Sequence, residues 1–86
     1  MKGKKAIITG GGRGLGKATA IAFANEGVDV AITGRNEALL IETVETLKSM
    51  GVRAYYAKFD VANGEEVKVA IAKLVEELGG VDYLVN

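Results

Sequence analysis

The segment TGGGRGLGK, residues 9–17, decides how this sequence folds. It contains five of the 12 glycines of the chain and stands between a short apolar run, residues 6–8, and the first helix-length segment. Glycine costs roughly 0.5 to 1 kcal/mol of backbone entropy in regular structure but allows close approach of the backbone to a ligand. So many glycines between a strand and a helix therefore indicate a binding loop, with an ordinary flexible loop as the alternative.

Short apolar runs alternate with amphipathic stretches along the rest of the chain. The runs at residues 6–8, 28–32, 52–59 and 81–85 predict strands, and the stretches between them repeat apolar residues with helical spacing. The three expected buried stripes are Leu15, Ala18, Ala22 and Phe23; Leu40, Val44 and Leu47; and Val67, Ile71, Leu74, Val75 and Leu78. The order β-α-β-α-β-α-β predicts an α/β fold, a parallel sheet with right-handed crossovers and helices on both faces.

The ends of these helices are marked by residues that cap helices. Asparagine precedes the second and third helices, and the cap before the third has a glutamate three residues later, which is the spacing of a capping box. Glycine stands where each helix should end in a left-handed conformation. The expected caps are Asn36 and Asn63 with Glu66, and the expected ends are Gly27, Gly51, Gly79 and Gly80.

Composition excludes several classes of protein. Eighty-six residues form at most one compact unit. The chain has neither cysteine nor histidine, so we predict no disulfide, no thiolate metal site and no metal centre. Eleven basic and 11 acidic residues leave no net charge to favour nucleic acid. The longest apolar run, residues 20–24, is far shorter than a bilayer span or a signal peptide core, and we expect a cytoplasmic protein without membrane partners.

Three known phosphate-binding patterns resemble the glycine segment to different degrees. The dinucleotide pattern GxGxxG fails in every register. The nucleoside triphosphate pattern GxxxxGK[ST] fits residues 11–17, but Ala18 stands where the magnesium-binding hydroxyl belongs, and Thr19 is one residue out of register. A third spacing, TGxxxGxG, fits without exception at Thr9, Gly10, Gly14 and Gly16.

This third pattern resembles the short-chain dehydrogenase/reductase family. Asp60-Val61 after the third strand and Leu84-Val85-Asn86 at the end of the chain are similar to further segments of that family. Arg13 and the Gly34-Arg35-Asn36 segment are most similar to 3-oxoacyl-[acyl-carrier-protein] reductases. The resemblance covers all 86 residues, a third of a typical member. It implies the amino-terminal part of one NAD(P)-binding Rossmann domain, residues 1–86, that stops after its fourth strand.

The resemblance also implies which residues contact a dinucleotide. The glycine segment would turn beneath the pyrophosphate. Asp60 and Val61 would bind adenine, although Asp60 could instead cap a helix, and Asn86 would lie beside a ribose unless it is a bare chain end. The expected cofactor-binding residues are Thr9, Gly10, Gly11, Gly12, Arg13, Gly14, Leu15, Gly16, Arg35, Asp60, Val61 and Asn86.

The end of the second strand favours NADP(H) over NAD(H). An acidic residue about 20 positions beyond the glycines commonly accepts the ribose hydroxyls of NAD. Here that stretch is Thr33–Asn36, and Asp29 lies at the other end of the strand. Arg35 and Arg13 could instead hold a 2′-phosphate with two guanidinium groups. The alternative is that Arg35 is a solvated loop residue and that Arg13 pairs with a carboxylate.

The family's activity would require residues that this chain lacks. Members reduce ketones with a Tyr-x-x-x-Lys pair, and none of the three tyrosines has a lysine four residues on. We therefore expect a cofactor-binding segment that is inactive alone. The implied partners of the complete protein are a small-molecule or carrier-protein-bound ketone and further copies of itself. The alternatives are a non-catalytic NADPH-sensing module and a phosphate-loop nucleotide hydrolase.

Overall fold

Seven elements, strands and helices in alternation, make up the computed structural model, which describes residues 3–10, 12, 14–59 and 64–85. The elements are β1 Lys5–Thr9, α1 Gly14–Asn25, β2 Asp29–Gly34, α2 Glu37–Ser49, β3 Ala54–Lys58, α3 Gly64–Leu78 and β4 Tyr83–Val85. The predicted order is therefore confirmed. Strands β3 and β4 begin two residues later than the apolar runs that predicted them, because the first residues of each run belong to the turn after the preceding helix.

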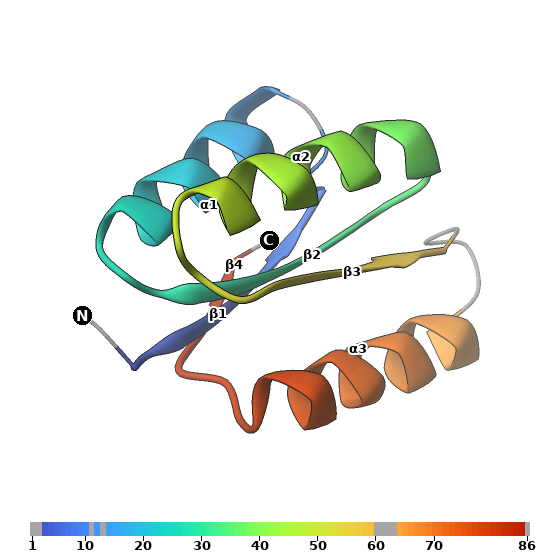
Figure 1. Ribbon diagram of the computed structural model, residues 1–86. Helices are drawn as coiled ribbons and strands as arrows, with labels where there is room; N and C mark the ends of the chain where they lie inside the picture. Colours follow the sequence, from blue (N-terminus) through green and yellow to red (C-terminus); the bar gives the residue numbers. More distant parts are fainter. Residues whose placement is uncertain (1–2, 11, 13, 60–63, 86) are drawn as a thin grey trace.

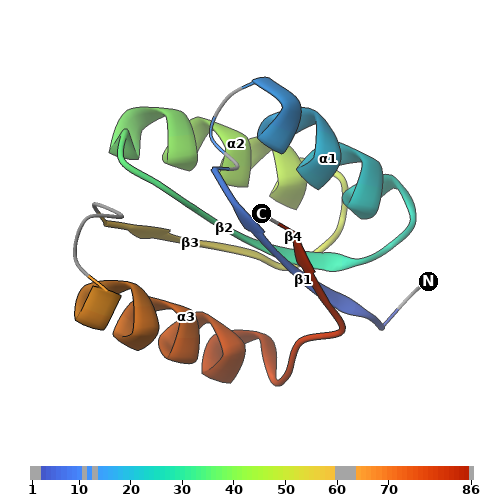
Figure 2. The same cartoon turned by 180° about the vertical axis from the view of Figure 1, so that it is seen from behind.

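The four strands form one parallel sheet in the order β3-β2-β1-β4. Helices α1 and α2 cover one face and α3 covers the other (Figure 1), and the view from behind shows the same three layers (Figure 2). Parallel neighbours need a long crossover, which each helix supplies. The Rossmann-type α/β arrangement with helices on both faces is confirmed.

The core consists of two apolar layers, one on each side of the sheet. Ala6 and Ile8 of β1 face α1 and α2, whereas Ile7 between them faces α3. All three are at most 1% exposed. A strand that is covered on both faces needs apolar side chains at successive positions, which explains the uninterrupted run in β1.

The apolar stripe predicted for α1 is wrong at three of its four residues, and only Phe23 is partly buried against the core. Leu15 is 84% exposed, and Ala18 and Ala22 are exposed as well, whereas the helix buries Ala20 and Ala24. Apolar residues surround almost the whole circumference of α1, so their spacing does not mark its inner face. Small side chains face the sheet there, and they allow the helix to approach it closely.

The stripes predicted for α2 and α3 are confirmed. Leu40, Val44 and Leu47 of α2 are buried, as are Leu74 and Leu78 of α3. Both helices have a charged outer face, so their apolar spacing identifies the inner one. None of the helices in the described part of the chain is long and apolar enough to cross a bilayer.

The predicted helix ends are confirmed where the structure describes them. Glycines 27, 51, 79 and 80 all have positive φ, between 80° and 137°. The Asn36 side chain accepts a hydrogen bond from the Leu39 N–H at 3.2 Å and so caps α2. The cap predicted at Asn63 lies outside the described residues.

Strand β4 forms one edge of the described sheet and pairs with β1 alone. Leu84, at its centre, is 59% exposed. An exposed apolar edge strand offers unpaired N–H and C=O groups to another chain.

We therefore expect the isolated 86 residues to self-associate. Sedimentation velocity should show oligomers whose fraction rises with concentration, and Leu84→Lys should increase the monomer fraction because a charge disfavours edge pairing. A wild-type segment that sediments as a monodisperse, cooperatively melting monomer would contradict this prediction.

Candidate functional site

The glycine segment connects the carboxyl end of β1 to the start of α1. Gly10 and Gly14 have φ values of 74° and 57°, which residues with a Cβ rarely adopt. No atom lies within 4 Å of the position that a Cβ would take at either residue, so the backbone conformation and not crowding calls for glycine. The Gly10 N–H donates to the Thr33 carbonyl at 2.8 Å, and this bond holds the loop beside the end of β2.

The amino terminus of α1 is suited to an anion. The helix begins at Gly14 and has no acidic residue in its first turn. The partial positive charge of a helix amino terminus and its free N–H groups attract phosphate. The start of α1 therefore offers an electropositive helix end beside the described glycines of the loop.

Leu40 of α2 packs against both the glycine loop and the end of β2. Its side chain is 1% exposed. A Cβ at Gly12 would lie 3.4 Å from Leu40 Cδ2, and a Cβ at Gly34 would lie 3.2 Å from the same atom. The two glycines thus let α2 lie directly against the loop and the strand end, and a side chain at position 34 would displace Leu40.

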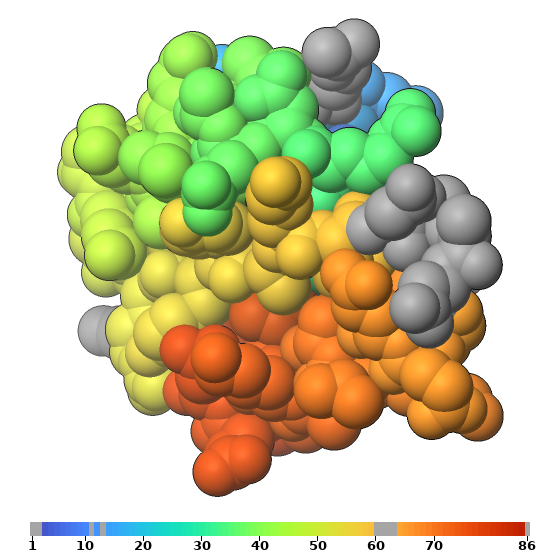
Figure 3. Space-filling view, turned by 90° about the vertical axis from the view of Figure 1, so that its right-hand side faces the viewer, coloured from blue at the N-terminus to red at the C-terminus, as the bar shows by residue number. Residues whose placement is uncertain are grey.

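A groove of about 1040 Å³ runs over the carboxyl ends of β1, β2 and β3. Its lining includes Thr9 and Gly10 beside the loop, Arg35 after β2 and Lys58 at the end of β3. Figure 3 views the molecule from this side, with β3 in yellow between α2 in green and the start of α3 in orange. Open parallel sheets bind ligands at this edge, and small-molecule sites commonly occupy ~300–1,000 Å³.

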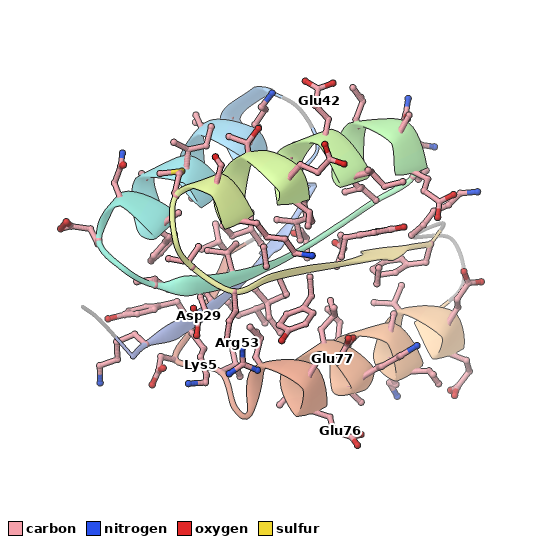
Figure 4. All side chains as sticks on the ribbon, viewed as in Figure 1. Lys5, Asp29, Glu42, Arg53, Glu76 and Glu77 are labelled. Atoms are coloured by element: carbon pink, nitrogen blue, oxygen red, sulfur yellow. The ribbon has the colours of Figure 1, made fainter. Side chains whose placement is uncertain are left out.

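The charges around the groove favour an anion after β2. Arg35 is exposed, lines the groove and makes no hydrogen bond or ion pair with the described part of the chain. Asp29 lies at the opposite end of β2, where its carboxylate accepts from the backbone N–H of Arg53 at 2.9 Å; Figure 4 labels both residues. Glu37 is the one acidic residue among the described lining residues, and Tyr56 donates a hydrogen bond to it at 3.2 Å.

The end of β4 lies beside the start of the glycine loop. The Thr9 hydroxyl donates to the Val85 carbonyl at 3.2 Å. This contact connects the two neighbouring strands at the edge of the sheet where the groove lies.

The structure brings together part of the predicted site. Four of the predicted cofactor-binding residues line the groove, namely Thr9, Gly10, Gly12 and Arg35. Gly14, Leu15 and Gly16 form the first turn of α1 beside the loop, and Leu15 projects into solvent. Gly11, Arg13, Asp60, Val61 and Asn86 lie outside the described residues, so their contacts stay predictions.

Comparison with known proteins identifies the family. The model of the short chain dehydrogenase family matches residues 4–86. The chain belongs to the short-chain dehydrogenase/reductase family. Over 84 residues it is 39% identical to a 3-oxoacyl-[acyl-carrier-protein] reductase of Staphylococcus epidermidis, a match that covers 96% of this chain and 34% of that protein.

Solved structures of this family share the fold. A short chain dehydrogenase from Burkholderia cenocepacia in complex with NADP is 40% identical, with a TM-score of 0.94 over 99% of this chain and 35% of that one. An NAD⁺-bound xylitol dehydrogenase is 31% identical, with a TM-score of 0.92 over 96% of this chain and 32% of that one. The chain therefore spans about a third of the length of the family members it matches.

The structure does not favour the phosphate-loop alternative for this family member. The Thr19 hydroxyl donates to the Leu15 carbonyl at 2.8 Å within α1, and the Lys17 ammonium pairs with Glu42 of α2 at 3.4 Å. In this structure the lysine and the hydroxyl thus contact α2 and the α1 backbone, respectively.

Several residues that line the groove were not predicted from the sequence as part of the site. Glu37 and Leu40 of α2, Lys58 of β3 and Val67 of α3 all line the groove. Their sequence signals were those of solvated charges or of core residues. Lys58 could have been predicted from its place at the carboxyl end of a strand, because open parallel sheets bind ligands at the carboxyl ends of their strands.

Proposed function

We propose that these 86 residues bind NADP(H) as the amino-terminal part of the Rossmann domain of an oxidoreductase that reduces a ketone. The observation that carries the proposal is the end of β2, where the unpaired Arg35 follows Gly34 and no acidic side chain occupies the strand end. Bound there, the nicotinamide dinucleotide would supply the hydride, and the residues of this chain hold its adenosine diphosphate half.

Steric contacts at Gly34 support NADP(H) over NAD(H). A carboxylate at the end of β2 commonly accepts the ribose hydroxyls of NAD. At position 34 such a side chain would bring its Cβ to 3.2 Å from Leu40 Cδ2, so the buried Leu40 side chain would have to shift by a few tenths of an ångström to admit it. Arg35, in contrast, is exposed and can donate two parallel hydrogen bonds to a phosphate.

The remaining predicted contacts belong to the same proposal. The glycine loop and the start of α1 cradle the pyrophosphate. Arg13 adds a second guanidinium at the 2′-phosphate, Asp60 and Val61 bind adenine, and Asn86 lies beside the ribose.

The reducing step itself is assigned to residues outside this chain. No Tyr-x-x-x-Lys pair occurs in the 86 residues, so we propose that the segment alone is inactive. Similarity to the reductase of Staphylococcus epidermidis supports a 3-oxoacyl thioester on a carrier protein as the substrate. We propose that the complete protein is a homo-oligomer.

Isothermal titration of the full-length protein with NADPH, NADH and magnesium-ATP tests the proposal. NADPH should bind at least about tenfold more tightly than NADH, because one hydrogen bond to a charged group contributes ~1.5–3 kcal/mol. Magnesium-ATP should bind far more weakly than NADPH. A preference for NADH would refute the role of Arg35, and binding of ATP alone would refute the whole proposal.

A further inference from the structure

Tyr56 and Glu37 form a hydrogen bond at the wall of the groove. Tyr56 lies on β3 with its ring against the α1 and α2 layer, and Glu37 is in the first turn of α2. The phenol donates to Glu37 Oε2 at 3.2 Å. Glu37 lines the groove, and both residues line a second hollow of about 490 Å³ over the outer edge of β3, so Glu37 stands between that hollow and the groove.

Two cations line the groove together with Glu37 and have no anionic partner in the described part of the chain. Arg35 precedes Glu37 by two residues, and Lys58 follows Tyr56 by two on the same strand. Both line the groove together with Glu37. The one ion pair in the described part of the chain joins Lys17 to Glu42, so neither Arg35 nor Lys58 is neutralised. Because Arg35 and Lys58 line the same groove as Glu37, a carboxylate released from Tyr56 could pair with either of them there.

The phenol is suited to hold this carboxylate at neutral pH. Partial burial and the hydrogen bond to Glu37 raise the pKa of Tyr56 above its usual value of 10. The hydroxyl therefore keeps its proton and donates throughout the neutral range. A phenylalanine at this position would fill the same space but could not hold Glu37.

We propose that Tyr56 is a positioning residue for cofactor selectivity. Its hydroxyl holds the Glu37 carboxylate on the outer side of the groove, so that Arg35 and Lys58 remain available to the 2′-phosphate of NADPH. The inference rests on the proposed function, because it concerns the phosphate that distinguishes NADPH from NADH. Glu37 by itself would compete with that phosphate for the cations.

The test compares NADPH and NADH affinities of the full-length wild type, Tyr56→Phe, Glu37→Gln and the Tyr56→Phe/Glu37→Gln double variant. Tyr56→Phe should weaken NADPH binding by about three- to fivefold, the scale of a surface ion pair, and leave NADH within about twofold. Glu37→Gln should bind NADPH at least as tightly as wild type. The double variant should match Glu37→Gln, because a freed amide does not compete with phosphate.

Tyr55→Phe is the matched control. Tyr55 neighbours Tyr56 but faces the α3 side of the sheet, where its hydroxyl accepts from Arg53 at 3.0 Å. Its loss should leave the ratio of the two affinities unchanged. The inference is overturned if Tyr56→Phe does not change that ratio, or if its loss of NADPH affinity persists in the double variant, which would make Tyr56 merely structural. A wild type that binds neither dinucleotide would instead refute the proposed function.

Discussion

Replacing Arg35 with aspartate should weaken NADPH binding by about 100-fold or more in the full-length protein. The variant loses a charge-assisted hydrogen bond of ~1.5–3 kcal/mol and adds a like-charge repulsion of ~1 kcal/mol at about 4 Å in water, and 1.4 kcal/mol corresponds to tenfold. NADH has no 2′-phosphate to repel, and the new carboxylate can accept from its ribose hydroxyls. The preference should therefore reverse, as measured by titration calorimetry with both dinucleotides.

Lys68→Asp is the matched control for the change in charge. Lys68 is exposed on α3 and does not line the groove. Long-range electrostatics alone would weaken NADPH binding in both variants, and that loss would decline with salt because exposed charges are screened beyond ~10 Å at 0.1 M. If Lys68→Asp weakens NADPH binding as much as Arg35→Asp does, the contact between Arg35 and the phosphate is refuted.

The layered fold was predictable because it depends on patterns that are local in the sequence. Continuous apolar runs mark strands that are covered on both faces, and the glycines that end helices need a left-handed backbone whatever surrounds them. Helix α1 shows where this fails. Its inner face is defined by small side chains such as Ala20 and Ala24 and not by the large Leu15, and hydrophobicity alone cannot rank those two kinds of residue.

The candidate site was predictable where its residues directly end or follow a strand, and not where side chains of two elements contact each other. Thr9, Gly10 and Arg35 directly follow or end strands, and spacing from the glycine loop identifies them. The bond between Tyr56 and Glu37 joins β3 to α2 over 19 positions of sequence. Such a contact depends on strand register and on how α2 crosses the sheet, which no local pattern specifies. Leu40 was therefore predicted as core without its contact with the loop.

Leu40→Ala should lower both the stability of the fold and its affinity for NADPH. Removing a fully buried leucine lowers the free energy of unfolding by ~2–5 kcal/mol. Leu40 also supports Gly12 and Gly34, because its Cδ2 lies 3.4 and 3.2 Å from the positions that a Cβ would take at these two glycines. A loop that loses this support must be ordered when the ligand binds, at a cost of ~0.5–1.5 kcal/mol or about two- to tenfold in affinity. Urea unfolding and titration of the full-length variant measure the two effects.

Leu47→Ala separates loop support from stability alone. Leu47 is 0% exposed, lies on the same helix and belongs to the same apolar cluster as Leu40, but it does not line the groove. Both variants should be destabilised by similar amounts, and both can be titrated at a temperature where each is fully folded. Only Leu40→Ala should then bind NADPH more weakly than wild type. Equal affinities in the two variants would show that the loop keeps its shape without Leu40, because any effect of lost stability is common to both.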